Sequence, residues 1–533
     1  MLRAIMTITI LLFAVGPALA NNVAISSMSL LTRDTSDGTQ ANHTRDIQFT
    51  VSWENSWCMT GAACAGAVTK PDANWDAVWV FAKYAVNTGG VWGDWTHCTL
   101  ATSGHTEPAG SQIVSPADGK GVFIYKDAVG AGTSTFTNTA IRWRYGADGV
   151  ADADLVRVRV FAIEMVYIPQ GGFYAGDHAT GIASFKQGTA DTDPWAIGSE
   201  DAITTTNTAS DGYYYVSNSQ TGEAASGDVF EIPADFPKGY NDFYIMKYEL
   251  SQGQWRDFLN TLTQAQQDTY TAATLTDEDD ANTYVMVVED QTAVAYRQTI
   301  KAGPNPADGE PYTFGCDLDD DDVLDEANDG EWIAMNDLSW GDLAGFADWV
   351  ALRPFTELEF EKAARGPLWP VADEYVWAST SATNTTAVDG NVGLTSELPS
   401  SATMNVLYLA GFSGPIRTGA FARSTGGLTR ALAGASYYGV MELSGNLWER
   451  TVTVGNAVGN AIGRAFTGIH GDGSLATAPA NWPLASDADG SGFRGSSWNS
   501  GLVRIRVSDR YYAALVSAAR SNTIGLRCAR TAP

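Results

Sequence analysis

The sequence predicts an α+β protein in which an antiparallel β-sandwich precedes a mixed α/β domain. Two patterns predict this fold class. Between residues 21 and 163, apolar and polar side chains alternate, as they do in strands with one buried face. Beyond residue 164, apolar side chains recur at helical spacing behind capping residues. The chain has 533 residues, and a single hydrophobic core stops growing at roughly 250 to 300 residues, so we expect more than one domain.

Residues 1–20 are expected to be a signal peptide. They contain an early arginine, an apolar run and the sequence Ala18-Leu19-Ala20 before a polar segment. This pattern is typical of a secretory leader that is cleaved after Ala20. The next residue is Asn21 and not cysteine, which argues against a lipoprotein anchor. We therefore expect export to the periplasm or the extracellular space. No later apolar run is long enough to predict membrane insertion.

Residues 21–163 read as the β-sandwich. In IQFTVSW, the apolar residues from Ile47 to Trp53 fall on one face, and in LVRVRVF the valines alternate with Arg157 and Arg159. Turn-rich stretches such as PADGKG separate such segments, and we predict no helix here. The many tryptophans of this part suit either a buried core or a carbohydrate platform, and burial is the more frequent case.

Residues 164–533 contain three predicted helices. Ser251 and Gln254 have the spacing of a capping box before a stripe of apolar residues, and Thr356 and Glu359 have the same spacing. Ser339 is the expected N-cap of a third helix. The residues expected to face inward are Trp255, Phe258, Leu259 and Leu262 in the first, Leu343, Phe346, Ala347 and Val350 in the Ser339 helix, and Phe360, Ala363 and Ala364 in the Thr356 helix.

The charge balance excludes some classes of partner. The chain has 32 Lys and Arg against 61 Asp and Glu, a formal charge of −29. Such a surface repels phosphate backbones and anionic lipid, so we expect no nucleic acid partner and no binding to a membrane surface. Cysteine and histidine give little evidence of a site. The five cysteines are too few for a disulfide scaffold, although Cys58 and Cys64 are close enough to bridge a loop, and the five histidines form no cluster for a metal.

Six blocks of sequence occur in a recognisable order beyond residue 164. They are MVYIPQGGF, FYIMKYELSQGQW, LSWGDLAGFADWV, RPFTELEFEKAARG, YGVMELSGNLWER, and FRGSSW through GLRCART. Together they resemble the formylglycine-generating enzyme (sulfatase-modifying factor) family. The resemblance covers residues 164–533 and implies a mixed α/β domain related to C-type-lectin-like folds.

The resemblance also locates the oxidase site of the family. Active members use two cysteines, five residues apart, which bind copper(I) and convert a substrate cysteine into formylglycine. Aligning the family motif with Arg494 places Ser500 at the first cysteine and Ile505 at the second. Neither side chain replaces a thiolate as a ligand of copper(I). We therefore expect no oxidase activity and no copper. Cys528 is expected to be a lone buried thiol, because its partner position in relatives is Ala347 here.

The resemblance implies structural calcium as the cofactor. In SGNLWER, Asn446 and Glu449 match a calcium-binding loop of relatives, and Asn391 resembles a ligand of a second family site. A separate candidate comes from the residues themselves. In CDLDDDDVLDEANDGE, Asp317, Asp319 and Asp321 alternate as in calcium loops, but Asp322 and Asn328 break the EF-hand pattern. Calcium binding and a merely solvated acidic loop both remain open for this segment.

The preferred hypothesis is an exported, non-catalytic binding or structural protein on a sulfatase-modifying factor domain without the copper-binding pair. The strand and loop from Trp498 to Tyr512 would bind a protein or glycan ligand at the cell exterior through one set of side chains. These are Asn499, Ser500, Leu502, Arg504, Arg506 and Tyr512.

Three alternatives stay open. The first is an enzyme or maturation factor that uses non-cysteine chemistry, although the three-histidine iron site of a sulfoxide-forming branch has no counterpart, so no iron is expected. The second is a ligand-binding protein diversified by a retroelement, since such proteins vary residues near the carboxy terminus of the same scaffold. The third is a surface component similar to gliding lipoproteins, which the missing lipoprotein cysteine disfavours.

Overall fold

The fold is described by a computed structural model, which is mostly strands with few helices and therefore α+β. The expected signal peptide and Cys64 lie outside the described residues, whereas Cys58 is disulfide-bonded. The described ranges are 23–59, 74–178, 183–188, 193–206, 212–215, 229–275, 281–288, 292–307, 309–423, 429–455, 461–476 and 479–533.

Two antiparallel sheets form the N-terminal part. The first has three strands in the order β1 (Ala24–Asp34), β2 (Thr44–Cys58) and β8 (Gly130–Trp143). The second has eight strands and runs β22-β16-β9-β3-β7-β6, with β4 and β5 paired to β3. Its strands are β3 (Asp76–Thr88), β4 (Val91–Trp92), β5 (Thr96–His97), β6 (Ser111–Val114), β7 (Val122–Lys126), β9 (Leu155–Ile168), β16 (Phe243–Met246) and β22 (Ala529–Thr531).

The predicted alternation in β2 is confirmed. Ile47, Phe49, Val51 and Trp53 are all buried, and the residues between them are partly exposed. They share one hydrophobic cluster with apolar side chains of β3, β7, β8 and β9, so the two sheets enclose a common core. Of the tryptophans of this part, Trp53, Trp75 and Trp79 belong to cores, whereas Trp92 is exposed and lies 4.8 Å below the guanidinium of Arg157.

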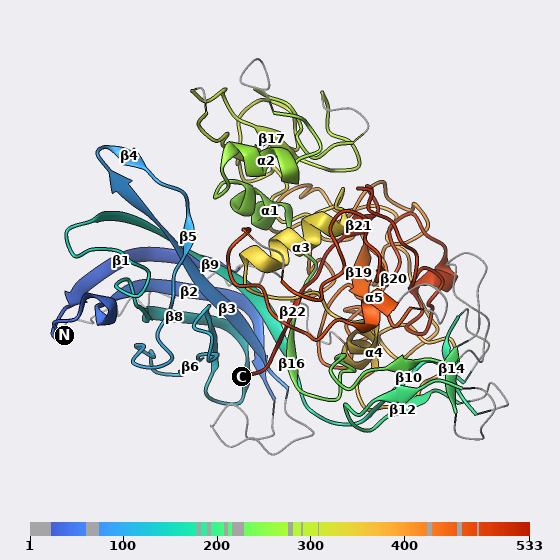
Figure 1. The fold of residues 1–533 in the computed structure, drawn as a ribbon. Coiled ribbons are helices and arrows are strands. Elements are labelled where there is room, and N and C mark those ends of the chain that lie inside the picture. The colour runs from blue at the N-terminus through green and yellow to red at the C-terminus, as the bar shows by residue number, and fades with distance from the viewer. Residues whose placement is uncertain are drawn as a thin grey trace, which may run out of the picture.

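Strand β9 crosses the domain boundary that we expect between residues 163 and 164. On one side, it pairs with β3 from Asn87 opposite Leu155 to Asp76 opposite Val166. On the other side, it pairs with β16, where Met246 lies opposite Met165. One hydrogen-bonded sheet therefore continues from the N-terminal part into the C-terminal part. Figure 1 shows β9, β16 and β22 between the N-terminal strands and the helices.

Three predicted helices are confirmed with their caps. They are α1 (Gln252–Leu259), α3 (Trp340–Trp349) and α4 (Glu357–Arg365), and each begins with a complete capping box on the expected Ser or Thr. All the side chains expected to face inward are buried. A fourth helix, α2 (Gln264–Tyr270), has a capping box on Thr263 and was not predicted. A short α5 covers Ala461–Arg464.

Short strands and long loops make up the rest of the C-terminal part. Two-stranded pairs are β10 (Phe173–Ala175) with β12 (Trp195–Ile197), β11 (Phe185–Gln187) with β14 (Tyr213–Tyr215), β13 (Ile203–Thr204) with β15 (Glu231–Ile232), and β17 (Ile300–Ala302) with β18 (Phe314–Cys316). A three-stranded sheet has the order β20 (Ser491–Arg494), β19 (Trp448–Val452) and β21 (Ile524–Gly525). Within the described part of the chain, 3-10 helices cover Gln40–Asn42 and Leu502–Ile505. Among the described residues, no helix has both the length and the apolar character needed to cross a bilayer.

A buried charge cluster lies where the two parts join. Lys247 follows β16, and its Nζ is 2.9 Å from a carboxylate oxygen of Asp76 in β3 and 2.9 Å from one of Glu164 in β9. It also donates to the Asn55 carbonyl in β2 at 3.0 Å and lies over the Trp57 ring. All three charged side chains are at most 2% exposed. A buried ammonium with two carboxylates and a carbonyl keeps most of its hydrogen bonds, so burial is tolerated.

The pKa of Glu164 predicts a pH-dependent contribution to stability. Burial raises this pKa from 4.5 to about 7, and although Lys247 opposes the shift, the charge of Asp76 adds to it. Because the pKa of the folded state is the higher one, the stabilisation is fully present below pH 4.5 and is lost as pH rises through about 7. The Glu164→Gln variant cannot titrate at this position. Its unfolding free energy should therefore rise relative to wild type by about 2 kcal/mol between pH 5.5 and pH 8.

Urea unfolding at both pH values measures this difference. Glu310→Gln, which changes an exposed glutamate, is the control and should show no such trend. A difference between Glu164→Gln and wild type that stays constant with pH would contradict the raised pKa of Glu164.

Candidate functional site

The segment with the expected ligand residues is a loop and not a strand beyond Arg494. Strand β20 ends at Arg494, and the chain then turns through Gly495 and Ser496, whose φ angles are 88° and 80°. A Cβ on Gly495 would lie 3.0 Å from the Leu443 carbonyl oxygen, so the turn favours glycine. The rest of the segment contains only the 3-10 helix Leu502–Ile505.

Buried ion pairs attach both ends of this segment, Arg494 and Arg510, to helix α4. The Arg494 guanidinium donates to Glu357 at 3.1 Å and to Glu361 at 2.7 Å, and Arg510 donates to Glu357 at 2.6 Å. All four side chains are fully buried. Burial raises the pKa of Glu357, but the charges of Arg510 and Arg494 outweigh it and hold the pKa below 4.5. The loop that follows therefore starts and ends on rigid points.

The two positions of the family cysteines have different surroundings. The Ser500 hydroxyl lies 3.0 Å from the Ser497 hydroxyl, and the Ser500 carbonyl accepts from the Leu409 amide at 2.8 Å. Ile505 is completely buried in a hydrophobic cluster with Phe360 and Leu443. One position is therefore a hydrogen-bonded hydroxyl near the surface and the other is core.

The expected ligand residues divide into exposed side chains and side chains with partners. Asn499 and Leu502 are exposed. Arg504 pairs with Asp509 at 3.1 Å, and Arg506 pairs with Asp373 at 2.7 Å. The Tyr512 ring packs edge-on against Trp448. The free contact surface of this segment is thus smaller and more apolar than the sequence predicts.

Further exposed apolar residues lie around Ser500, and we did not predict them. Val503 is 42% exposed beside Leu502, and Leu409, whose amide binds the Ser500 carbonyl, is 63% exposed. Tyr296 is 40% exposed and packs on the Trp498 ring at 5.4 Å. We call Asn499, Leu502, Val503, Leu409 and Tyr296 the apolar face. Leu409 and Tyr296 are far from Ser500 in sequence. Only Val503, which lies next to Leu502 in the chain, could have been predicted as part of this surface.

The expected calcium ligands Asn446 and Glu449 have protein partners for most of their polar atoms. Asn446 accepts from the Ile416 amide at 3.0 Å and donates to the buried Glu249. One Glu449 oxygen accepts two bonds from Arg527, at 2.6 and 2.9 Å, while its other oxygen is buried without a donor among the described residues. This arrangement ties β19 to the chain before α1 and to the C-terminal segment.

Asn391 lies in a loop after residue 388. Its side-chain amide donates to Asp389 at 3.3 Å, and its backbone amide donates to the same carboxylate at 3.1 Å.

The acidic loop brings Asp317, Asp319 and Asp321 together. One carboxylate oxygen from each lies within 4.8 Å of the others. The same loop has a second cluster of Asp317, Asp320 and Asp322, and the Lys301 ammonium donates to all three at 2.6 to 3.0 Å. The carboxylates of the alternating aspartates therefore lie close together, and Lys301 binds the neighbouring group of carboxylates.

One comparison decides the family of this chain. The model of the FGE-sulfatase family, described as the sulfatase-modifying factor enzyme 1-like domain, matches residues 159–532. The chain belongs to the sulfatase-modifying factor family. The match covers most of the chain and confirms the resemblance of the six sequence blocks. No curated protein matches the chain.

The match of the sulfatase-modifying factor domain begins within β9, inside the sheet that both parts of the chain share. Its described thiols are buried. Cys316 and Cys528 are free and lie in the main hydrophobic cluster, with Ala347 in the same cluster as Cys528. Burial raises the pKa of Cys316 to about 12 and also raises that of Cys528. Neither sulfur is a reactive thiolate.

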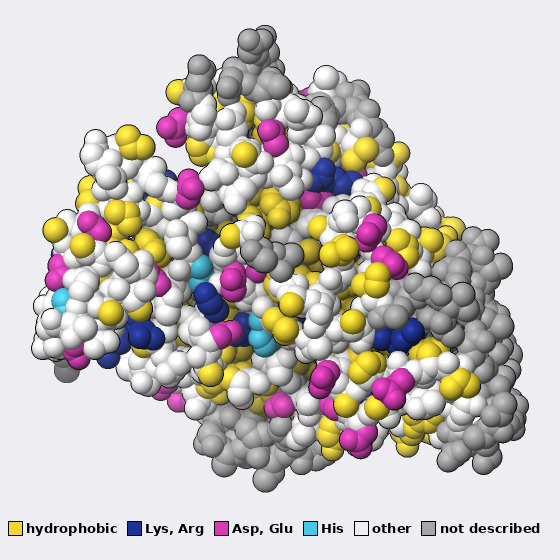
Figure 2. Space-filling view, in the orientation of Figure 1, with side chains coloured by type: hydrophobic (Ala, Val, Ile, Leu, Met, Phe, Trp, Pro, Cys, Tyr) yellow, Lys and Arg dark blue, Asp and Glu magenta, His cyan; other side chains and the backbone are white. Residues whose placement is uncertain are grey.

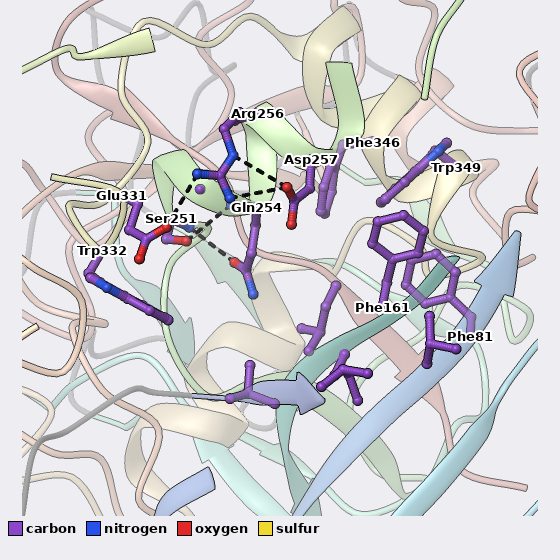
Figure 3. Close-up of a pocket in the computed structure, with 16 residues that line it drawn as sticks. Phe81, Phe161, Ser251, Gln254, Arg256, Asp257, Glu331, Trp332, Phe346 and Trp349 are labelled. Atoms are coloured by element: carbon purple, nitrogen blue, oxygen red, sulfur yellow. Dashed lines mark hydrogen bonds and ion pairs between the residues drawn. The ribbon is translucent and has the colours of Figure 1, made fainter. Parts of the chain in front are cut away.

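A cavity of about 230 Å³ lies where the N-terminal sheet meets this domain. Figure 3 shows Phe81, Phe161 and Trp349 on one side and Trp332 on the other, with charged side chains of α1 between them. Arg256 pairs there with Asp257 at 3.1 Å and with Glu331 at 3.3 Å. No lining residue belongs to the apolar face or to residues 499–512. The lining comes from widely separated segments, so sequence reasoning missed this cavity.

The Asn446→Asp variant distinguishes a structural amide from a calcium ligand. The new carboxylate would face the buried Glu249 carboxylate, and an unpaired buried charge costs about 3 to 5 kcal/mol. We therefore expect Asn446→Asp to lower the unfolding free energy by about that amount, measured by urea unfolding with and without calcium. Asn481→Asp is the matched control, because Asn481 is exposed and has a similar φ of 65°. An Asn446→Asp protein as stable as wild type in calcium would favour the family calcium site instead.

Proposed function

We propose that this chain is an exported, non-catalytic binding or structural protein built on a sulfatase-modifying factor domain. The main support for this proposal is that neither of the two positions at which active family members have cysteine can bind copper(I) here. Ser500 is hydrogen-bonded to Ser497, and Ile505 is part of the core. Copper(I) chemistry needs a pair of thiolates, and no other cysteine occurs between residues 317 and 527 to supply one.

The surroundings of Ser500 also argue against a serine nucleophile. Such a nucleophile needs a base within hydrogen-bond reach, most often histidine. His470, the one histidine after residue 178, accepts a bond from the Thr531 amide at 3.0 Å. Burial, together with Arg530 and Arg353, lowers its pKa to about 2, so it is a poor base. This favours a binding role for the segment over catalysis.

The apolar face is the ligand surface that we propose. Asn499, Leu502 and Val503 lie on the loop held by the Arg494 and Arg510 ion pairs. Leu409 is attached to this loop through the Ser500 carbonyl, and Tyr296 packs on Trp498. Exposed aliphatic and aromatic side chains on a rigid base suit a protein or glycan ligand. On the view of Figure 2, Lys and Arg side chains occur in small separate groups, which agrees with a partner other than nucleic acid.

We propose that the two N-terminal sheets act as a β-sandwich and that the family domain has a C-type-lectin-like arrangement. We also propose that the protein lies in the periplasm or outside the cell, and that calcium stabilises it while copper and iron play no part. The partial use of Asn446 and Glu449 by Glu249 and Arg527 weakens the family calcium site in this chain.

An oxidase assay tests the absence of catalysis. The purified chain, supplied with copper(I) and oxygen, should form no aldehyde from a cysteine peptide that an active family member oxidises, and it should retain no stoichiometric copper. Mass spectrometry of the peptide and metal analysis of the protein measure both results. Aldehyde formation by this chain would refute the non-catalytic role.

A binding screen with two matched variants tests the apolar face. Ligands from glycan and peptide arrays should bind Leu502→Asp at least about tenfold more weakly than wild type, because a charge would replace exposed apolar contact. Leu484→Asp changes another exposed leucine, which does not belong to the apolar face, and should bind like wild type. Equal loss in both variants, or loss in neither, would remove the apolar face as the binding surface.

A further inference from the structure

Two tryptophans and one arginine form a stacked platform on the N-terminal sheet. Trp92, in β4, is 38% exposed, and Trp95 is partly exposed. The Arg157 guanidinium, from β9, lies 4.8 Å from the centroid of the Trp92 ring and 4.6 Å from that of the Trp95 ring. Because β4 pairs with β3, where Asn87 lies opposite Trp92, backbone hydrogen bonds hold this platform on the sheet.

Stacking leaves the hydrogen-bond donors of Arg157 available to a ligand. Aromatic rings contact the faces of a guanidinium, whereas its N–H groups point outward in its plane. Among the described residues, no carboxylate or carbonyl accepts a bond from the Arg157 side chain. Partial burial and the charge of Arg159 lower the pKa of Arg157, so this cation has no compensating anion in the protein. A ligand carboxylate fits such donors in bidentate geometry.

A continuous strip connects this platform to the 230 Å³ cavity. Arg157, Arg159 and Phe161 alternate along β9 and therefore lie on one face of the sheet. The Arg159 guanidinium is 5.2 Å from the centroid of the Trp95 ring and donates to the Asn260 carbonyl, directly after α1, at 3.4 Å. Phe161 lines the cavity, so about 13 Å of strand separates the cavity from Arg157. We call Trp92, Trp95, Arg157, Arg159 and the cavity the β9 strip.

The cavity presents hydrogen-bonding groups between aromatic walls. Arg256 binds one carboxylate oxygen of Asp257 at 3.1 Å and one of Glu331 at 3.3 Å. Gln254 accepts the Ser251 amide through its side-chain oxygen at 3.1 Å. Within the described ranges, the second oxygen of each carboxylate and the Gln254 NH₂ group have no partner. Figure 3 shows these side chains between Trp332 on one side and Phe81, Phe161 and Trp349 on the other.

We propose that the β9 strip binds a glycan chain, with a uronic acid unit on the platform and an uncharged unit in the cavity. The uronic acid carboxylate would pair with Arg157, and its ring would pack on the exposed Trp92 side chain. The cavity suits an uncharged sugar, because hydroxyl groups match its free acceptors and donor and apolar C–H groups match its aromatic walls. A second acidic unit there would face the Asp257 and Glu331 carboxylates.

An acidic peptide is the alternative occupant, and its chemistry fits the cavity less well. Carboxylates only accept hydrogen bonds, so acidic side chains leave the free oxygens of Asp257 and Glu331 without donors. The formal charge of −29 repels any polyanion at long range. At physiological ionic strength this repulsion is screened beyond about 8 Å, so the direct contacts with Arg157 determine whether an anionic glycan binds.

Calorimetric titration of the purified full chain tests this inference. The probe is a hyaluronan hexasaccharide, in which glucuronate alternates with uncharged N-acetylglucosamine. Wild type should bind this probe. Chitohexaose, which has no carboxylates, should bind at least about tenfold more weakly, because the charge-assisted hydrogen bonds are lost. Poly-L-glutamate at the same carboxylate concentration should not displace hyaluronan.

Variants with matched controls locate the binding. Arg157→Gln and Trp92→Ala should each weaken hyaluronan binding at least about tenfold, and Glu331→Ala should weaken it about fivefold. Arg144→Gln and Trp369→Ala change another exposed arginine and another exposed tryptophan, and both should bind within about twofold of wild type. Circular dichroism and thermal melting should show that all five variants are folded.

The apolar face is a separate surface, because none of its residues lines the cavity or belongs to the platform. Leu502→Asp should therefore bind hyaluronan like wild type, and the β9 strip can fail or hold independently of the apolar face. Loss of hyaluronan binding in Leu502→Asp would place the glycan on the apolar face and refute the β9 strip.

Three further results would overturn the inference. The first is wild type that binds hyaluronan no more tightly than chitohexaose. The second is displacement by poly-L-glutamate that Arg157→Gln abolishes, which would assign the platform to an acidic protein segment. The third is an equal effect of Arg157→Gln and Arg144→Gln, which would reduce the binding to a general effect of positive charge.

Discussion

One buried ammonium group holds the two parts of this protein in a single body. Lys247 comes from the chain just after β16, and its two carboxylate partners come from β3 and β9. Asp76 also accepts from the Trp53 indole and the Ser56 hydroxyl of β2, so both N-terminal sheets converge on the same charge. If one of these strands shifted, Lys247 or one of its carboxylate partners would be left buried without an opposite charge. Unpaired charges in a core are strongly unfavourable, so the strands are held together.

Local sequence predicted the helices of the family domain well, since capping boxes and apolar stripes involve neighbours within a few residues. Ser251, Ser339 and Thr356 all cap as expected. Thr263 begins the same capping pattern, but helix α2 was not predicted, because its residues are mostly polar and show no stripe of apolar side chains. The continuity of β9 could not be predicted. It depends on pairing with β3 and β16, which lie before and after β9 in the chain. The sequence of a long apolar strand has the same pattern whether the strand belongs to one part of the protein or is shared by two.

The candidate site was predictable to a similar degree. The family blocks identified the two cysteine positions, which Ser500 and Ile505 occupy, and the alternating aspartates identified the acidic loop, because both are local sequence features. The partners of Asn446 and Glu449 were not predictable, since Glu249 and Arg527 are far away in sequence. The same reason hid Leu409 and Tyr296 beside Ser500.

The strand that crosses the boundary also limits how this protein can be divided. A cut between residues 163 and 164 would split β9 within its ladder with β3 and divide the strand between the two fragments. Each fragment would present unpaired amides and carbonyls next to apolar side chains such as Val166 and Val160, and such edges promote aggregation. The N-terminal part is therefore not an interchangeable module, and grafting it onto another family domain would require a recipient whose own edge strand continues the same sheet.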